Sequence, residues 1–303
     1  MRLVTAAGRL TLLSPDGKTE LDGMASDRLF GWDVAELSAG RFDSSPQGVY
    51  ARWAEFRAWV AETNPSAGEI KPQLIDPMSL GPVAPRPPQV FAVGLNYRDH
   101  ATESGMAIPD EPLVFTKYAS AFTGPYGEIA LSPGDVDWEV ELVAVIGIGG
   151  HRIQEADGWD HVAGLTVGQD LSDRVTQFAV APPQFGMGKS YPGFAPVGPA
   201  LVTVDELRAA GHDPDDLEIG CAVNAQTVQK SRTGQMVFSV PALVAKLSEV
   251  VTLLPGDVMF TGTPAGVGVG QDPPRFLAEG DELTTWCEGI GRLRHRLVGK
   301  AAS

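Results

Sequence analysis

The sequence predicts an α+β fold that is mostly β, with few helices and a small N-terminal domain. Glycine (35 residues) and proline (24 residues) are frequent, which favours many turns and short strands over a helix bundle. Runs rich in β-branched and aromatic residues, such as the one from Val136 to Gly147, are typical of strands. The 303 residues are 43% hydrophobic, enough for one large core, with room for a smaller domain beside it.

The composition disfavours nucleic acid as a partner and gives expectations for the thiols and for membrane spans. The formal net charge of −15 disfavours nucleic-acid binding, because an acidic surface repels phosphates, but it allows a small anionic substrate in a locally positive cleft. Cys221 and Cys287 lack metal-ligand spacing, so we expect reduced thiols and a cytoplasmic protein, with one disulfide as the alternative. The first residues lack the apolar segment of a signal peptide, and no run approaches the ~18 apolar residues of a membrane span.

Residues 1–85 are predicted to form the small N-terminal domain. Arg2–Leu13 is strand-like, and Ser14–Gly17 reads Ser-Pro-Asp-Gly, a turn signal. Gly48–Val60 carries aromatic residues at helical spacing, which predicts a helix that packs through this stripe. Four prolines between Pro82 and Pro88 form a stiff connector to the main domain, residues 86–303.

A short strand from Val90 is followed by a predicted helix that begins at His100. His100 and Glu103 are three residues apart and therefore neighbours on one helical face. A carboxylate beside an imidazole raises its basicity and orients it, as a general base requires, although a plain surface pair has the same spacing. The segment Ser104–Pro112 is rich in turn residues, so we expect this pair to lie on a mobile lid.

Acidic residues at two-residue spacing interrupt the strand Val136–Gly147. Asp137, Glu139 and Glu141 would point to the same side of an extended strand. Two interpretations remain open: a solvent-facing edge, or oxygen ligands for a cation such as Mg²⁺. A second apolar run ends at Asp170, where a carboxylate is placed to complete a site with Glu139 and Glu141.

The rest of the chain is predicted to contain more strands and one helix. Lys189 lies in a glycine-flanked loop where the backbone can approach a ligand closely, or it is an ordinary surface lysine. The glycines at 147–150 and 266–270 do not match nucleotide-binding loops. The remaining predictions are a strand pair at 220–229 and 236–240, a helix at 241–251, a strand and polar loop at 253–270 that can bind a carboxylate, and a closing hairpin at 280–291. The other histidines have no identifiable partners: His151, His161, His212 and His295.

Seven motifs in order resemble the fumarylacetoacetate hydrolase family and span about residues 90–298. They are Gly-Leu-Asn-Tyr-Arg-Asp-His-Ala-Thr-Glu (94–103), Asp-Trp-Glu-Val-Glu-Leu (137–142), Gln-Asp-Leu-Ser-Asp-Arg-Val-Thr-Gln (169–177), Gly-Lys-Ser (188–190), Pro-Val-Gly-Pro (196–199), Leu-Pro-Gly-Asp-Val (254–258) and Thr-Gly-Thr-Pro-Ala-Gly-Val-Gly (261–268). Residues 103–115 also look like the branch that contains 2,4-diketo-3-deoxy-sugar-acid hydrolases.

The resemblance implies a mixed β-roll of curled sheets, a homodimer and a divalent-metal site. It implies that Glu139, Glu141 and Asp170 hold Mg²⁺ or Mn²⁺, with Asp137 behind them or facing solvent. The residues implied to carry the chemistry are His100 and Glu103, which activate water, and Lys189; those implied to contact substrate are Arg174, Gln177, Thr263 and Lys117. Where some members have another metal-binding aspartate, this chain has Val93, which favours a three-carboxylate site.

We therefore expect a metal-dependent hydrolase that cleaves a carbon–carbon bond in a 2,4-diketo acid through a stabilised enolate. His100 would activate the attacking water and Lys189 would stabilise the developing oxyanion. Three alternatives stay open: an oxaloacetate-type decarboxylase, a 2-hydroxymuconate-type isomerase, and a non-catalytic protein that binds a small molecule.

Overall fold

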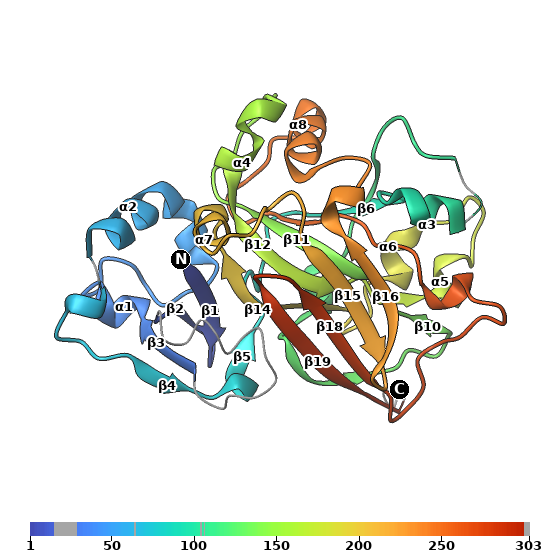
Figure 1. Ribbon diagram of the computed structural model, residues 1–303, viewed down its shortest axis with the longest axis horizontal. Helices are drawn as coiled ribbons and strands as arrows, with labels where there is room; N and C mark the ends of the chain where they lie inside the picture. The colour runs from blue at the N-terminus through green and yellow to red at the C-terminus, as the bar shows by residue number, and fades with distance from the viewer. Residues whose placement is uncertain (15–28, 64, 104, 106, 300–303) are drawn as a thin grey trace.

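The computed structural model describes residues 1–14, 29–63, 65–103, 105 and 107–299. Its regular structure is mostly β, in several curled sheets with few helices, which confirms the predicted fold class (Figure 1). The turn predicted at Ser14–Gly17 lies outside the described residues except for Ser14, as do positions 104 and 106 of the predicted lid. None of the helices in these ranges is long and apolar enough to cross a membrane.

The largest sheet runs through the whole molecule. Its strands follow the order β4-β3-β2-β1-β14-β12-β11-β17-β6-β7, with β5 paired to β1 and β8 paired to β14. The strands are β1 (Arg2–Ala6), β2 (Arg9–Leu13), β3 (Leu29–Asp33), β4 (Gln73–Ile75), β5 (Leu80–Gly81), β6 (Val90–Gly94), β7 (Leu113–Phe115), β8 (Phe122–Thr123), β11 (Val140–Ile146), β12 (Val162–Gln169), β14 (Ala195–Val202) and β17 (Val258–Phe260). Because β1 pairs with β14, the N-terminal strands continue the same sheet, and the boundary near residue 85 stays a prediction.

A second sheet has the order β16-β15-β18-β19-β9, in which β9 is parallel to β19. These strands are β9 (Tyr126–Ala130), β15 (Glu218–Val223), β16 (Gln226–Arg232), β18 (Glu282–Cys287) and β19 (Gly291–Val298). The pair β18–β19 is the predicted closing hairpin. The short strands β10 (Val136–Asp137) and β13 (Ser172–Asp173) form a separate antiparallel pair.

One of two buried apolar clusters lies between the two sheets, where β11, β12 and β14 pack against β15, β18 and β19 (Figure 1). The other cluster joins the large sheet to the aromatic residues of α2. Every residue of β11, β12 and β14 is buried, which explains their nearly continuous apolar sequences. Each sheet therefore covers one face of the other, and the polar residues within β11 and β12 are held away from bulk water.

The helices are short and lie around the sheets. They are α1 (Val34–Leu37), α2 (Trp53–Thr63), α3 (Arg98–Glu103), α4 (Gly158–His161), α5 (Arg174–Gln177), α6 (Phe185–Gly188), α7 (Val204–Ala209) and α8 (Val240–Val250). The stripe predicted at 48–60 is a 3₁₀ turn followed by α2, whose Trp53, Phe56 and Trp59 are buried. Phe56 and Trp59 pack against the Phe42 ring. The aromatic stripe is therefore a packing face, as predicted.

Two strand predictions are wrong in part. The partner of β15 is β16, directly after it, and not 236–240, because the Ser239 hydroxyl caps α8 and draws Val240 into its first turn. The predicted strand 136–147 is broken between Asp137 and Val140, where the Glu139 amide donates to the side-chain carbonyl of Gln169. The helix predicted at 241–251 is confirmed as α8.

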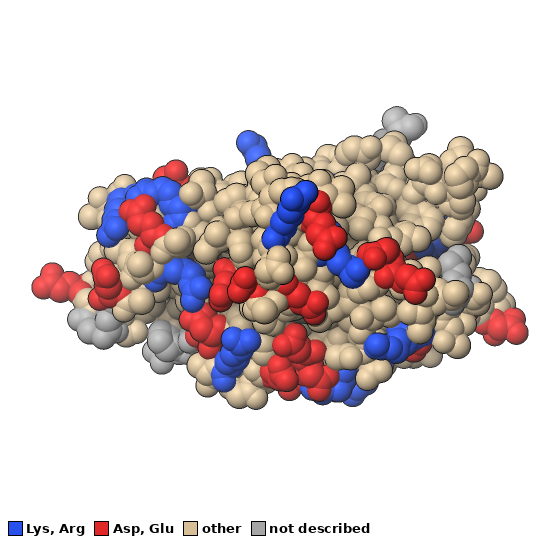
Figure 2. Space-filling model, turned by 90° about the horizontal axis from the view of Figure 1, so that it is seen from above, with Lys and Arg blue, Asp and Glu red and all other residues tan. Residues whose placement is uncertain are grey.

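The surface carries charges of both signs. Figure 2 shows acidic and basic side chains interspersed over the lower and left parts of one face, with a broad uncharged area at its upper right. Cys221 and Cys287 are both buried and are not joined in a disulfide, so the alternative of one disulfide does not apply.

Candidate metal and proton-transfer site

Three buried carboxylates meet at the carboxyl end of β12 and the beginning of β11. One oxygen from each of Glu139, Glu141 and Asp170 lies within 4.8 Å of the others. They are 7%, 1% and 0% exposed, so the solvent-edge interpretation of the acidic strand is wrong. Asp170 is delivered by the antiparallel pairing of β11 with β12, and its amide donates to the Glu139 carbonyl at 2.8 Å.

Two buried lysines contact these carboxylates. The Lys189 ammonium lies 2.7 Å from Glu139 Oε2 and 2.6 Å from Asp170 Oδ2. The Lys117 ammonium lies 2.6 Å from Asp170 Oδ1 and also donates to the Lys189 carbonyl. Lys189 is therefore not a surface lysine, and Lys117 lies behind Asp170 with only 1% of its surface exposed.

Arg174 at the start of α5 joins the cluster from the other side. Its guanidinium is 2.6 Å from Asp137 Oδ2 and 2.7 Å from Glu139 Oε1, and it donates to Gln177 Oε1 at 2.8 Å. Asp137 is fully buried and does not face solvent. Its carboxylate holds Arg174 in place, and it also accepts from the amides of Gly268 and Val269.

The charges of the cluster do not balance. Four carboxylates (Asp137, Glu139, Glu141 and Asp170) face three cations (Lys117, Lys189 and Arg174). Glu141 accepts a hydrogen bond from the Gly262 amide, and no ion pair to it occurs among the described residues. A cation beside Glu141 would supply the missing charge.

The pKa values of the two glutamates move in opposite directions. Burial opposes ionisation of Glu139, but Lys189 and Arg174 outweigh it and lower its pKa to about 2. Burial raises the pKa of Glu141 well above its usual value, and the nearby Asp170 and Glu139 carboxylates add to this effect. A buried set of three oxygen ligands that lacks one positive charge fits a hard divalent ion such as Mg²⁺ or Mn²⁺.

His100 and Glu103 form the predicted pair on α3. His100 Nδ1 lies 3.1 Å from Glu103 Oε2, which assigns the proton to Nδ1 and the lone pair to Nε2. Glu103 Oε1 accepts from the Gly266 amide at 2.9 Å. Gly266 has a φ of +105°, and a Cβ there would lie 2.1 Å from the Val228 carbonyl oxygen, so the loop needs glycine at this position.

The loop 261–270 is the part that connects the pair to the carboxylates. Its amides donate hydrogen bonds to the side chains of Glu141, Glu103 and Asp137. The loop predicted to bind a carboxylate therefore binds carboxylates of the protein's own side chains. The His100 imidazole is close enough to Glu139 for the two side chains to interact electrostatically when the imidazole is protonated. The His100–Glu103 pair and the acidic cluster are thus held by the same loop.

Sequence reasoning missed the buried amides that hold this loop. Gln229 on β16 donates to Thr263 Oγ1 and the Pro264 carbonyl, and its own carbonyl accepts from the Val140 amide. Asn96 binds the carbonyls of Thr261 and Phe238. Thr263 is 3% exposed and is positioned by Gln229. Buried amides leave no periodic signal in a single sequence, although Asn96 lies within the motif that contains His100.

Comparison with known proteins identifies the family. The sequence model for the fumarylacetoacetate (FAA) hydrolase C-terminal region matches residues 89–298. The chain belongs to the fumarylacetoacetate hydrolase family. Human mitochondrial oxaloacetate tautomerase FAHD2A is 46% identical over 221 residues, 72% of this chain and 69% of that protein.

Solved structures of similar proteins cover the whole chain. A putative HpcE protein from Mycobacterium smegmatis is 48% identical, with a TM-score of 0.88 over 99% of this chain and 100% of that one. Maleylpyruvate hydrolase from Sphingobium sp. SYK-6, solved with manganese(II) and pyruvate, is 25% identical, with a TM-score of 0.76 over 99% of each chain or more. That structure shows one member of the family with a divalent metal and a small keto acid bound.

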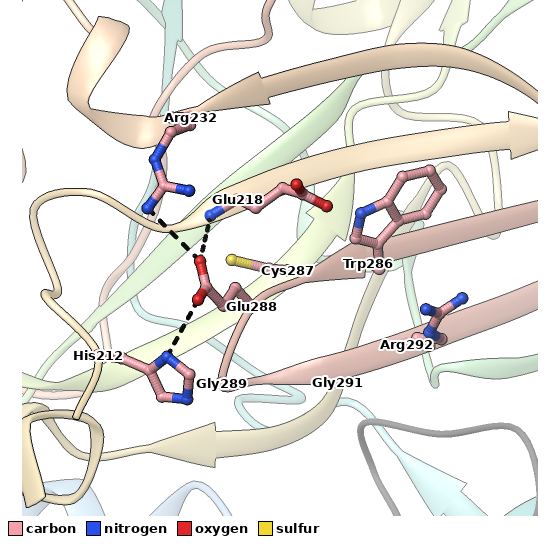
Figure 3. Close-up of a pocket in the computed structure, with 9 residues that line it drawn as sticks. All are labelled: His212, Glu218, Arg232, Trp286, Cys287, Glu288, Gly289, Gly291 and Arg292. Carbon is pink, nitrogen blue, oxygen red and sulfur yellow. Dashed lines mark hydrogen bonds and ion pairs between the residues drawn. The ribbon is translucent and has the colours of Figure 1, made fainter. Parts of the chain in front are cut away.

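The remaining histidines lie outside this site, and the expectation that they lack partners is wrong for three of them. His295 on β19 is buried and donates from Nε2 to the Gly124 carbonyl, and His161 Nδ1 lies 2.7 Å from the Ile148 carbonyl. His212 lines a cavity of about 430 Å³ against the β15–β18–β19 sheet, where it pairs with Glu288 (Figure 3). Glu288 also contacts Arg232, so the charges of this cavity compensate one another.

Proposed function

We propose that this protein is a metal-dependent enzyme that interconverts the enol and keto forms of a small 2-keto diacid of the oxaloacetate type. The observation that carries the proposal is the shared loop 261–270, which holds the His100–Glu103 pair beside the acidic cluster. The similarity to oxaloacetate tautomerases over 72% of the chain favours this reaction over the others that the same site allows.

In this proposal Glu139, Glu141 and Asp170 hold the divalent ion, which is Mg²⁺ or Mn²⁺. When bound, the ion would act as a Lewis acid toward the 2-keto oxygen and so favour the enolate. Lys117 holds Asp170 from behind and keeps the Lys189 backbone in place. Lys117 is therefore a positioning residue in this account and not a substrate contact.

His100 moves the proton. Its Nε2 lone pair accepts the proton of the enol hydroxyl and returns a proton to the neighbouring carbon, so the product has the mass of the substrate. Glu103 stabilises the imidazolium that forms between the two steps. Because Glu103 is also bound to the Gly266 amide, the imidazole keeps its orientation through both transfers.

The substrate carboxylates are proposed to bind at the positive side of the cluster. Lys189 and Arg174 supply the charge, while Gln177 and Thr263 supply further hydrogen bonds. In this arrangement the negatively charged substrate lies beside Lys189 and Arg174, the two cations that contact Glu139. The predicted homodimer and the cytoplasmic location are not tested by these observations and stay predictions.

Hydrolysis of a carbon–carbon bond in an acylpyruvate is the second candidate. It is favoured by the similarity to maleylpyruvate hydrolase, whose structure holds manganese and pyruvate. The same His100 would then remove a proton from water, and Lys189 would stabilise the oxyanion at the attacked carbonyl.

One assay separates these reactions. The purified chain is incubated with Mn²⁺ or Mg²⁺, or with EDTA, and with enol-oxaloacetate or an acylpyruvate, and the loss of enol absorbance is followed. We expect metal-dependent loss with a product of unchanged mass from enol-oxaloacetate. Two acids that together contain one added water would establish hydrolysis, release of CO₂ would establish decarboxylation, and no metal-dependent reaction would contradict the proposal.

A further inference from the structure

Gln229 is a buried glutamine on β16 whose side-chain hydrogen-bonding positions are all filled. It is 1% exposed, and its side-chain oxygen accepts from the Val140 amide at 3.0 Å and from the Cys221 thiol at 3.2 Å. Its side-chain nitrogen donates to Thr263 Oγ1 at 2.8 Å and to the Pro264 carbonyl at 2.7 Å. A primary amide has two acceptor positions and two N–H donors, so this group has no capacity left for a ligand.

The neighbours of Gln229 fix which way its amide faces. The Val140 amide can only donate, so the atom that it meets must be the side-chain oxygen. The Pro264 carbonyl can only accept, so the atom beside it must be the side-chain nitrogen. The opposite orientation would place donor against donor and acceptor against acceptor. The nitrogen of Gln229 therefore faces Thr263 as a donor.

This contact decides how the Thr263 hydroxyl can act. A hydroxyl has one hydrogen to donate and accepts through its oxygen lone pairs, and at Thr263 the oxygen accepts from Gln229. Among the residues that the structure describes, none accepts the hydrogen of this hydroxyl. The hydrogen is thus free for a ligand, although the side chain is only 3% exposed.

The neighbouring threonine of the sequence Thr-Gly-Thr lacks this freedom. Thr261 Oγ1 donates to the Leu142 carbonyl at 2.8 Å, so its hydrogen is used within the protein. Thr261 and Thr263 are both buried and lie two residues apart, yet they differ in what their hydroxyls can do. The difference arises because Gln229 approaches Thr263 as a donor.

Thr263 also lies next to the acidic cluster. The preceding residue, Gly262, donates its amide to Glu141 at 2.7 Å. A ligand atom that reaches the Thr263 hydroxyl must be an acceptor, such as a carboxylate or keto oxygen. A donor fixed at this point favours 2-keto acids over ligands that would present an N–H or O–H group there, because two facing donors leave a polar group unpaired.

We propose that Gln229 is a positioning residue that keeps the Thr263 hydroxyl as a donor toward an anionic oxygen of the substrate. Gln229 itself touches no substrate and acts through Thr263. The same amide also holds Val140, which lies between Glu139 and Glu141 in the chain, so one side chain aligns this donor with the proposed metal ligands. The inference rests on the proposed function, because it assumes that a keto acid binds beside the acidic cluster.

Replacement of Gln229 by methionine, which has a similar length and no N–H donor, tests this role. In Gln229→Met the Thr263 hydroxyl can turn toward the Pro264 carbonyl, so at saturating Mn²⁺ we expect KM for enol-oxaloacetate to rise about 10-fold or more. We expect kcat to stay within about twofold of the wild type, because the lost contact is one of binding. Gln226→Met, exposed on the same strand, is the matched control and should keep the wild-type values.

A double variant separates this role from general damage to the fold. Thr263→Val should raise KM by the same factor as Gln229→Met, and the two substitutions together should cause no further rise, because the first removes the hydroxyl that the second misdirects. Additive effects of the two substitutions, or a fall in kcat without a rise in KM, would overturn the proposal.

A second variant and a second readout make the test independent of the reaction. Gln229→Glu keeps the acceptor for the Val140 amide, but its carboxylate accepts from Thr263, so the hydroxyl hydrogen is drawn away from the ligand. In calorimetric titrations of the Mn²⁺-loaded protein with pyruvate, a simple 2-keto acid, both Gln229→Met and Gln229→Glu should bind about 10-fold or more weakly than the wild type.

The two readouts distinguish failure of this inference from failure of the proposed function. A wild type that does not turn over enol-oxaloacetate contradicts the proposed function, and the pyruvate titrations then decide the role of Gln229. Wild-type affinity for pyruvate in either folded Gln229 variant, or a Mn²⁺-loaded wild type that binds no pyruvate, would overturn the inference.

Discussion

Glu103 is the residue that unites the site, because its two oxygens contact different parts of it. One oxygen accepts from His100 and the other from the Gly266 amide, within the loop that also binds Glu141 and Asp137. The imidazole orientation is thus coupled to the same backbone that positions the acidic cluster. Such a preorganised base loses little to reorganisation when a proton is transferred.

The first prediction concerns His100 itself. His100→Ala removes the base but none of the proposed metal ligands, so we expect kcat to fall by about 10²–10⁴ while the affinity for Mn²⁺ stays that of the wild type. Steady-state kinetics and calorimetry measure the two quantities. His151→Ala, at an exposed position, is the control. If His100→Ala keeps the parent activity, His100 is not the base.

At the scale of residues, the sequence predicted which side chains would meet, but not what would surround them. The sequence predicted that Glu139, Glu141 and Asp170 lie close together. The prediction used the two-residue spacing of the glutamates and the position of Asp170 at the end of an apolar run. The burial of Asp137 and its contact with Arg174 could not be predicted, because they depend on α5 and on the loop at 268–269. The supporting amides Gln229 and Asn96 were missed for the same reason.

At the scale of elements, β19 is held to its parallel neighbour by a buried histidine. His295 donates from Nε2 to the Gly124 carbonyl, just before β9, and its buried Nδ1 has no hydrogen-bond partner among the described residues. Burial lowers the pKa of His295 from 6.5 to about 4. Above pH 6.5 the imidazole is neutral in both the folded and the unfolded chain. Below that pH the unfolded chain binds a proton that the folded chain does not bind until about pH 4, so stability falls.

This pKa shift predicts a loss of about 2 kcal/mol in the free energy of unfolding between pH 8 and pH 5 from His295 alone. His295→Gln keeps an N–H donor without titrating, so its stability should fall less over this range than that of the wild type. Urea unfolding at fixed protein concentration measures the difference, with the exposed His151→Gln as control. Identical pH dependence in His295→Gln and the wild type would contradict the shift.

Helices marked by residues close together in the sequence were predicted better than strands, whose place in a sheet depends on their pairing partners. The proline in the first turn of α8 and the aromatic stripe of α2 each produced the expected helix. The strand predicted at 236–240 failed because β16 follows β15 after a two-residue turn and takes its place in the sheet. Strand pairing is a non-local property, and an apolar run alone does not identify the neighbour.

At the scale of the whole molecule, the N-terminal strands share a sheet and a buried apolar cluster with the strands that carry the candidate site. Leu3, Leu10 and Phe56 belong to the same buried cluster as Val143 and Phe260. The domain boundary near residue 85 was predicted from composition. A boundary of this kind is compatible with a chain that folds as one cooperative unit. The continuous sheet through β1 and β14 favours cooperative unfolding.

We therefore predict that Phe56→Ala destabilises the whole chain. Phe56 is fully buried in α2, so its truncation should cost about 3–5 kcal/mol, and the protein should still unfold in one calorimetric transition. Glu62→Ala, exposed on the same helix, is the control. Two transitions, of which only one moves in Phe56→Ala, would show that residues 1–85 fold separately.

We propose that Glu139, Glu141 and Asp170 hold one divalent ion. Calorimetric titration of the chelator-treated protein with Mn²⁺ tests it most directly, in the wild type, in Glu141→Gln and in the exposed control Glu128→Gln. We predict one ion bound per chain, with affinity lowered at least ~10²-fold by Glu141→Gln and unchanged by Glu128→Gln. Metal-free Glu141→Gln should be at least as stable as the wild type, because it lacks a buried uncompensated charge. Unchanged Mn²⁺ binding by Glu141→Gln would contradict the account.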